Sequence, residues 1–220
     1  MKIYKYFTLA FIVIVIDQTS KLLVYYNMQM GPFGEINVIG EWFRLHYLLN
    51  PGMAFGIKWN NEFGKLALTL FRLIAMVVIT MYMINMAKKN SHPGFLWAMA
   101  LILGGAIGNV IDSTFYGIFL DNAPADAPIK LFHGQVIDML FFPLFDFYWP
   151  DWVPFVGGDY FLFFSPVFNI ADASIFIGVA IILIFQRKFF PQHEKKEVDE
   201  VGAEQTAANE NLSTESEQQS

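Results

Sequence analysis

The chain has 220 residues, of which 55% are hydrophobic, 17% are aromatic and only 15% are charged, and it contains no cysteine. An average soluble domain has roughly 25% charged residues, so this composition excludes a disordered chain, a coiled coil and a nucleic-acid-binding protein with a basic face. It predicts a protein whose solvent is a lipid bilayer. The lack of cysteine also excludes disulfides, thiolate nucleophiles, iron–sulfur clusters and cysteine-based zinc sites.

The net charge of −6 belongs to the C-terminal end of the chain. Residues 191–220 carry eight acids and two lysines, whereas residues 1–190 carry twelve acids and twelve bases. The end of the chain is also rich in Glu, Gln, Ser and Asn and poor in large apolar residues. We therefore expect residues 1–190 to form a membrane domain and residues 191–220 to be a disordered acidic tail.

Four apolar segments are long enough to cross a membrane, which takes roughly 20 residues in a helix. They are residues 6–26, 66–86, 95–115 and 166–187. The first begins like a signal peptide, but no small-residue cleavage site follows it and an apolar stretch resumes after residue 21. We expect it to be retained as a membrane span.

Lysine and arginine residues predict the orientation of these spans. Eight of them flank the span ends that would share one side: Lys2, Lys5, Lys88, Lys89, Arg187, Lys188, Lys195 and Lys196. Only four fall on the other side, spread over the much longer loops 27–65 and 116–165. Both termini are therefore expected in the cytoplasm, and the two long loops outside it.

The two outer loops have different compositions. Residues 37–49 alternate imperfectly and are rich in β-branched and aromatic residues, which predicts one or two strands. Residues 141–164 are strongly aromatic, which is typical of the interfacial belt of a membrane protein or of a packed extracytoplasmic core. The predicted fold is an all-α membrane protein with four transmembrane helices and a small extracytoplasmic β-rich loop region.

Ionisable groups inside membrane spans are costly and usually functional. Asp17, Asp112 and Asp172 lie in the predicted spans, and a rise of about 1.5 Å per residue places them all toward the outer face. Asp138 lies in the second outer loop. Arg72, near the outer end of the second span, lies in the same layer and either pairs with an acid or extends to the lipid headgroups.

Two of these acids share a local pattern, because Asn109 precedes Asp112 by three residues and Asn169 precedes Asp172 by three. Positions i and i+3 share a helix face. An asparagine amide beside a carboxylate can donate a hydrogen bond to it or hold a water for it. The pattern therefore favours a functional site at the outer ends of the spans.

Further patterns concern structure. Asp17 and Lys21 form an i,i+4 pair, for which a structural role is preferred. The small residues of Gly104–Gly108 predict close helix packing, and Asn50–Gly56 predicts a turn in the first outer loop. The histidines lack metal-ligand spacing and the serines lack a histidine or lysine partner, so metal and serine-nucleophile chemistry are not expected.

Together these segments resemble the lipoprotein signal peptidases, also called signal peptidase II, which are bacterial membrane aspartic proteases. Five segments occur in the family's order: DQTSK at 17–21, NPGMAF at 50–55, GGAIGNVID at 104–112, GQVIDM at 134–139 and FNIADASI at 168–175. The resemblance covers residues 5–187. The chain departs from the family at Ser113 and Pro51, where arginine and threonine are usual, and in longer segments on both sides of Asp138.

The resemblance implies a catalytic dyad of Asp138 and Asp172 that needs no metal or cofactor. It implies supporting or substrate-positioning roles for eight other residues: Asp17, Lys21, Asn50, Gly52, Asn109, Asp112, Asn169 and Ala171. The implied substrate is a lipid-modified prolipoprotein, cut before its diacylglyceryl cysteine. The implied protein is a multi-pass monomer of the bacterial inner membrane that contacts its substrates and membrane lipids but no nucleic acid, with its site near the extracytoplasmic face.

Two other classes compete with the peptidase. A non-enzymatic proton or ion transporter would use intramembrane carboxylates as a relay, but it needs acids at several depths, and the inner halves of the predicted spans lack them. A membrane assembly factor could bind through the aromatic loops, but it gives no reason for the two Asn-x-x-Asp patterns. The peptidase is therefore the preferred hypothesis.

Overall fold

The computed structural model describes residues 3–52, 62–163 and 166–190. The described residues fall into two compact units that divide after Ile182. In the second unit the described part contains the short helix α6 (Gln186–Phe189). The predicted acidic tail, residues 191–220, lies outside the described residues.

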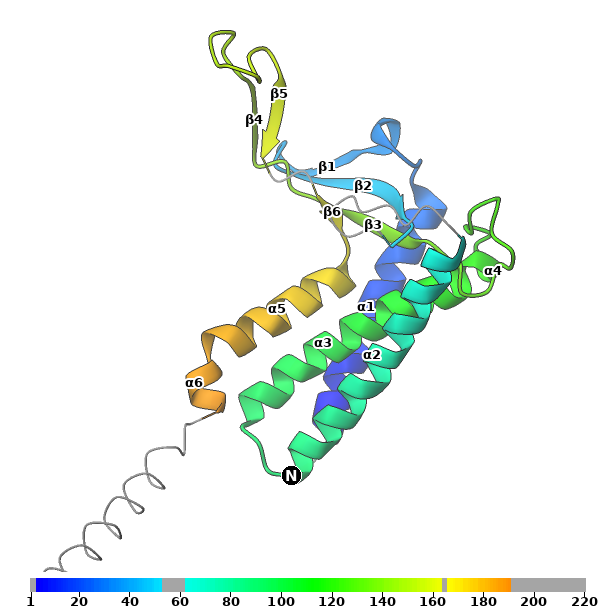
Figure 1. Ribbon diagram of the computed structural model, residues 1–220, viewed down its shortest axis with the longest axis vertical. Helices are drawn as coiled ribbons and strands as arrows, with labels where there is room; N and C mark the ends of the chain where they lie inside the picture. The colour runs from blue at the N-terminus through cyan, green and yellow to red at the C-terminus, as the bar shows by residue number, and fades with distance from the viewer. Residues whose placement is uncertain (1–2, 53–61, 164–165, 191–220) are drawn as a thin grey trace, which may run out of the picture. The chain divides into compact units, whose positions relative to one another are not determined.

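Three long apolar helices dominate the first unit (Figure 1). They are α1 (Tyr4–Asn27), α2 (Glu62–Lys88) and α3 (Pro93–Ile111), which continues through the π-helical turn η2 (Asp112–Tyr116) into α4 (Gly117–Phe119). Within the described residues, these three are long and apolar enough to cross a membrane, which agrees with the first three predicted spans. The predicted fourth span contains α5 (Ile170–Ile184), whose 15 residues make it shorter than the apolar segment 166–187.

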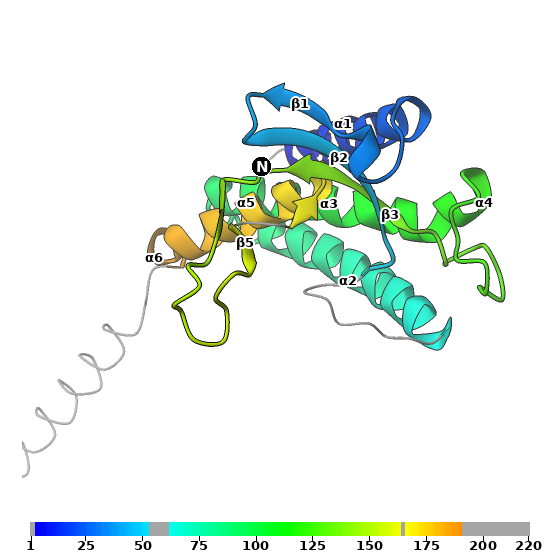
Figure 2. The ribbon, with the colours of Figure 1, turned by 90° about the horizontal axis from the view of Figure 1, so that it is seen from above.

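Glycines allow α1 and α5 to approach α3 closely, as we predicted from the small residues of these segments. Seen from above, α3 runs between α1 and α2 (Figure 2). A Cβ atom on Gly104 would lie 2.8 Å from the carbonyl oxygen of Ala10 in α1, and one on Gly178 would lie 2.7 Å from that of Ala98 in α3. A Cβ atom on Gly105 would collide with the carbonyl oxygen of Ala171 in α5. Side chains at these positions would push the helices apart.

A four-stranded antiparallel sheet lies at one end of the helices (Figure 1). Its order is β1 (Ile36–Ile39), β2 (Phe43–Asn50), β3 (Val136–Phe141) and β6 (Val167–Phe168). The first outer loop therefore forms two strands, within the range predicted. Asn50 pairs with Val136 and Leu48 with Asp138, so the register brings the end of β2 beside the acid in β3.

A small core joins the sheet to the helices. The buried side chains Ile137 and Met139 of β3 and Tyr47 of β2 cluster with Val24 of α1 and Tyr116 of η2. Full burial of an apolar side chain of this size contributes roughly 1.5–3 kcal/mol. The core thus fixes β3, which carries Asp138, over the ends of α1 and α3.

The aromatic segment forms a separate two-stranded ribbon of β4 (Phe145–Tyr148) and β5 (Tyr160–Phe163). Rings pair across the strands, with centroids 4.6 Å apart for Phe145 and Phe163 and 5.3 Å apart for Tyr148 and Tyr160. Trp152, between the strands, is exposed. The ribbon therefore packs partly on itself and also presents aromatic rings at its surface.

Candidate active site

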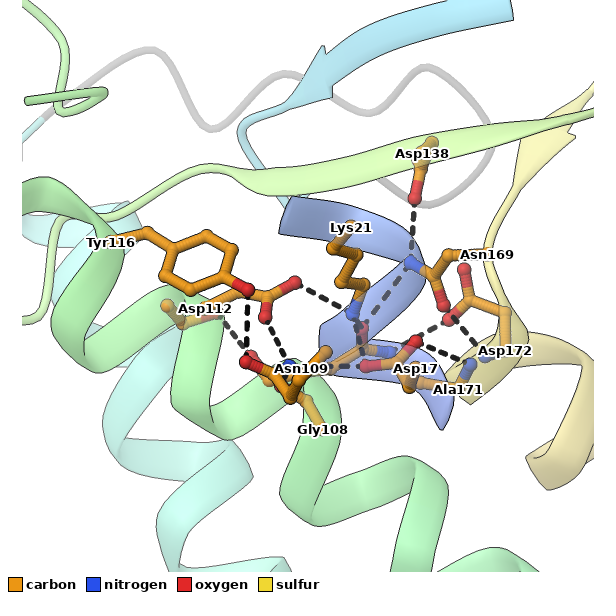
Figure 3. A network of polar contacts seen from close by, with 12 residues as sticks. Asp17, Lys21, Gly108, Asn109, Asp112, Tyr116, Asp138, Asn169, Ala171 and Asp172 are labelled. Carbon is orange, nitrogen blue, oxygen red and sulfur yellow. Dashed lines mark hydrogen bonds and ion pairs between the residues drawn. The ribbon is translucent and has the colours of Figure 1, made fainter. Parts of the chain in front are cut away.

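Four acids from separate parts of the chain meet where the helices end beneath the sheet (Figure 3). Asp17 comes from α1, Asp112 from the start of η2, Asp138 from β3 and Asp172 from the first turn of α5. Asp17, Asp112 and Asp138 are buried, and Asp172 is partly buried. The predicted convergence of the acids in one layer is therefore observed.

Lys21 is the cation at the centre of this cluster. Its Nζ donates to Asp17 Oδ2 at 2.7 Å and to Asn109 Oδ1 at 3.2 Å, and it pairs with Asp112 Oδ2 at 2.7 Å. An ammonium group has three donors; here two hydrogen bonds, to Asp17 and Asn109, are joined by an ion pair with Asp112. Because buried charges are stable only when they are paired and hydrogen-bonded, this arrangement supports the structural role predicted for Asp17 and Lys21 and adds Asp112 to it.

Gln18 is a residue of this cluster that the sequence reasoning missed. Its Nε2 lies 2.8 Å from Asp112 Oδ1 and 3.1 Å from Asp17 Oδ2, and its Oε1 accepts a hydrogen bond from the Tyr116 hydroxyl at 2.9 Å. Gln18 thus cross-links α1 to α3 and η2. A polar amide beside Asp17 inside an apolar span was the available signal, because such groups seek partners on other helices.

The second Asn-x-x-Asp pattern is the N-terminal cap of α5. Asn169 Oδ1 accepts a hydrogen bond from the backbone N–H of Asp172 at 2.9 Å, the usual N-cap arrangement. The backbone N–H of Ala171, also in the first turn of α5, donates to Asp17 Oδ1 at 2.9 Å. Since the first N–H groups of a helix have no partner within it, Asn169 and Asp17 together fix where α5 begins.

The first Asn-x-x-Asp pattern works differently from the expected side-by-side pairing. Asn109 Nδ2 donates to Asp172 Oδ1 in α5 at 2.8 Å, and not to Asp112 one turn away. Asn169 Nδ2 donates to Asp138 Oδ1 at 2.7 Å and lies 3.3 Å from Asn109 Oδ1. Two asparagine amides in mutual contact therefore hold the carboxylates of Asp138 and Asp172 (Figure 3).

Asp138 is also held from the first outer loop. Its Oδ2 accepts a hydrogen bond from Asn50 Nδ2 at 2.9 Å, while Asn50 Oδ1 accepts one from the backbone N–H of Gly52 at 2.8 Å. Gly52 has a φ of 97°, a left-handed conformation that favours glycine. Of the turn predicted at Asn50–Gly56, residues 50–52 make this turn and orient Asn50 toward the acid, and residues 53–56 lie outside the described residues.

The pKa of Asp138 is raised from 3.8 to about 7. Burial is the largest cause, because it penalises the charged form, and the negative charge of Asp172 is the second. The hydrogen bonds from Asn50 and Asn169 oppose both. A carboxyl group that is half protonated near neutral pH beside a second carboxyl group can share a proton with it, as acid–base catalysis at neutral pH requires.

Arg72 points into the site rather than out to the headgroups. Its Nη1 donates to the hydroxyl of the fully buried Ser113 at 2.7 Å. Of the two alternatives that the sequence left open, the inward one is therefore nearer to the structure, although the hydrogen-bond partner is a serine and not an acid.

Comparison with known proteins identifies the family. The model of the family described as "Signal peptidase (SPase) II" matches residues 9–188. The chain belongs to the signal peptidase II family. A lipoprotein signal peptidase of Amoebophilus asiaticus is 50% identical over 196 residues, covering 89% of this chain and 83% of that protein. One from Porphyromonas gingivalis is 39% identical and covers 80% of each chain.

A similar fold is also found among solved structures. A solved structure described as a bacterial membrane enzyme is 26% identical, with a TM-score of 0.57 over 90% of this chain and 94% of that one. The family resemblance predicted from five short motifs is thus confirmed. The roles of the individual site residues stay predictions.

Proposed function

We propose that this signal peptidase II family member is an aspartic endopeptidase that removes the signal peptide from lipid-modified prolipoproteins. Its relatives of 50% and 39% identity are named lipoprotein signal peptidases, which supports the substrate class. The observation that carries the aspartic mechanism is the pair Asp138 and Asp172. Each carboxylate is held by an asparagine amide, and the pKa of Asp138 is about 7.

The two acids have different surroundings, which suits them to different roles. Asp138 lies on a strand, buried, and its raised pKa favours the protonated form that polarises the scissile carbonyl. Asp172 lies in the first turn of α5, where the helix N-terminus favours a negative charge. Ionised Asp172 takes a proton from a water whose oxygen attacks the carbonyl carbon, and the leaving nitrogen is then protonated.

The supporting residues fix the positions of the dyad. Asn109 and Asn169 bind the two carboxylates directly, and Asn50 with Gly52 holds the second oxygen of Asp138. Lys21 joins Asp17 to Asp112, and Asp17 in turn binds the backbone of Ala171 next to Asp172. These contacts support substrate cleavage indirectly, because they hold the dyad in place.

The proposed membrane arrangement has four spans, both termini in the cytoplasm and the dyad near the extracytoplasmic face of the bacterial inner membrane. The distribution of lysine and arginine supports the orientation, and the acids gather at the sheet end of the helices. At this depth a signal helix and acyl chains in the bilayer would bring the bond before the lipidated cysteine to the dyad. The protein would act as a monomer, with substrates and membrane lipids as its partners.

The test is cleavage of a diacylglyceryl-modified prolipoprotein by the purified protein in detergent. Asp138→Asn and Asp172→Asn should each lower the rate by about 100-fold or more, without loss of membrane insertion. Asp121→Asn is the matched control, because Asp121 is an exposed acid paired with Lys130. Near-normal activity of Asp138→Asn would show that the dyad is misassigned, and Asp112 would become the candidate partner of Asp172.

The proton or ion transporter is not favoured. In the part of the chain that the structure describes, the four acids of the helix–sheet junction form one cluster joined by hydrogen bonds and ion pairs. A relay across the membrane needs groups at successive depths. The names of the relatives also support the peptidase.

A further inference from the structure

The segment that leads into β3 is fixed to η2 through its backbone. The N–H of Phe132 donates to the carbonyl oxygen of Thr114 at 3.0 Å, and the N–H of Gly134 donates to that of Ser113 at 3.0 Å. A Cβ atom on Gly134 would collide with the carbonyl oxygen of Asp112, so the two backbones lie in close contact there. A π-helical turn interrupts regular α-helical hydrogen bonding and is frequent at functional sites. Here carbonyl oxygens of the turn hold the approach to β3.

Phe132 has an unfavourable backbone conformation within this segment. Its φ is 64°, in the left-handed region where a Cβ atom comes too close to the backbone and a bulky residue is an outlier. Such conformations persist only where the surrounding structure imposes them, and they cluster at functional sites. The hydrogen bond to Thr114 holds the N–H group of Phe132, but its carbonyl group needs a partner of its own.

Thr69 of α2 supplies that partner. Its hydroxyl oxygen lies 2.9 Å from the carbonyl oxygen of Phe132, and the residue is completely buried. The hydroxyl also lies 3.0 Å from the carbonyl oxygen of Lys65, one turn earlier in α2. A hydroxyl has one hydrogen to donate, and a carbonyl inside an α-helix already accepts from the N–H four residues later. Phe132 is therefore the acceptor that depends on Thr69.

The residues after Phe132 transmit its position to Asp138. Gln135 and Asn122 are joined by three hydrogen bonds of 2.8 to 3.1 Å, each between a side chain and the other residue's backbone. Val136, which follows, is buried and pairs with the end of β2. A backbone change at Phe132 must therefore break these contacts or move the start of β3 with the acid that it carries.

We propose that Thr69 is a positioning residue whose buried hydroxyl holds Phe132 in the left-handed conformation and so sets the position of Asp138 relative to Asp172. This inference rests on the proposed function. A misplacement of reacting groups by about 1 Å can lower a rate by about 100-fold. A hydrogen bond from α2, which carries none of the four clustered acids, thus acts on catalysis through β3. The effect falls on kcat, because the dyad acts on substrate that is already bound.

The experiment measures kcat and KM for a diacylglyceryl-modified prolipoprotein in detergent. Full-length variants are compared at a temperature well below their unfolding transitions. Thr69→Val keeps the shape of the side chain and removes the hydroxyl, whereas Thr69→Ser keeps the hydroxyl. Thr80→Val is the matched control, because the Thr80 hydroxyl donates within its own helix, to the carbonyl oxygen of Met76 at 2.8 Å.

Loss of the hydroxyl should slow the chemical step. Thr69→Val should lower kcat about tenfold, the change in population expected when one buried hydrogen bond is lost. Its KM should stay within about twofold of the wild-type value, because substrate binding is not altered. Thr69→Ser should recover most of the loss in kcat, and Thr80→Val should match the wild type.

A second background tests whether the strained backbone of Phe132 is the link. Glycine adopts positive φ about as readily as negative φ, so in Phe132→Gly the conformation no longer depends on Thr69. In that background Thr69→Val should lower kcat by no more than about threefold. Phe132→Leu also lacks the aromatic ring but stays strained, so there Thr69→Val should still lower kcat about tenfold.

A purely structural role makes a different prediction. If Thr69→Val lowers Tm but leaves the kcat of the folded enzyme unchanged, or costs the same in Phe132→Gly as in Phe132→Leu, the inference is wrong even though wild-type cleavage stands. If the wild type does not cleave the lipid-modified substrate, the proposed function fails and the inference fails with it.

The test also survives a Thr69→Val variant that does not fold. Phe132→Val then decides, because a β-branched residue fits the left-handed conformation worst. A kcat for Phe132→Val well below that of Phe132→Gly supports the proposal, and equal values of kcat overturn it.

Discussion

Replacement of Lys21 by methionine tests whether the buried ion cluster holds the site together. Asp17 Oδ2 and Asp112 Oδ2 each lie 2.7 Å from Lys21 Nζ, so they are separated by no more than twice that distance. Without the cation, two unit charges so close repel each other by about 3 kcal/mol at an effective dielectric constant of roughly 20. Removal of one partner of a buried pair typically costs about 3–5 kcal/mol. We therefore expect Lys21→Met to lower the free energy of unfolding by about 3–5 kcal/mol.

Thermal unfolding of the purified protein in detergent measures this effect. For a chain of this length, the expected loss lowers Tm on the order of 10 °C. Lys89→Met is the matched control, because Lys89 is an exposed lysine directly after the end of α2. The double change Lys21→Met with Asp17→Asn should recover part of the loss, since it removes one of the two repelling charges and keeps an oxygen for the N–H of Ala171.

The reasoning fails if Lys21→Met unfolds at the same temperature as Lys89→Met. It also fails if the double variant is no more stable than Lys21→Met alone. Either result would mean that the ion cluster of Asp17, Lys21 and Asp112 contributes little to stability, and that Lys21 serves the site in another way.

Three further predictions test other parts of the molecule. Gly105→Ala and Gly178→Ala should each destabilise the contact between α3 and α5 by about 1–3 kcal/mol. Only Gly105→Ala should lower the rate of cleavage tenfold or more, because it displaces Ala171 beside Asp172. Equal cleavage rates for the two variants would contradict this. The raised pKa of Asp138 means that its protonation stabilises the wild-type fold fully below pH 3.8, and that this contribution is lost as the pH rises to about 7. Asp138→Asn lacks this contribution, so its Tm should rise relative to that of the wild type between these pH values. A constant difference in Tm would refute the prediction. Truncation after His193 should leave specific activity unchanged, and a large drop with normal membrane insertion would show that the acidic tail matters.

The sequence predicted the components of the site better than their connections. Hydropathy located the three long helices, and the cost of charge in a bilayer drew attention to Asp17, Asp112 and Asp172. The i,i+3 spacing of Asn109 and Asp112 suggested a contact on one helix face, but Asn109 instead reaches Asp172 on α5. Spacing along one helix cannot reveal that a neighbouring helix offers a better-placed partner.

Asp138 illustrates a second limit of the sequence. Nothing in the local pattern of residues 134–139 reveals that they form the third strand of a sheet whose other strands lie before α2 and just before α5. The strand that carries Asp138 pairs with β2, and the hydrogen bond between Asn50 and Asp138 joins residues 88 positions apart in the sequence. Tertiary packing sets this pairing. Only the resemblance to the family pointed to this residue, because its motif gave no physical reason to select it.

The placement of the dyad on two kinds of element explains how this chain can prepare similar carboxyl groups for opposite tasks. Asp138 extends from a strand into a buried site, where its pKa is raised to about 7. Asp172 stands in the first turn of α5, whose start is fixed by Asn169 and Asp17, and a negative charge is favoured at that end of a helix. Asn169 contacts both acids, because its Oδ1 caps Asp172 while its Nδ2 binds Asp138. Any change that moves the start of α5 should therefore alter the geometry of the dyad and the pKa of Asp138 together.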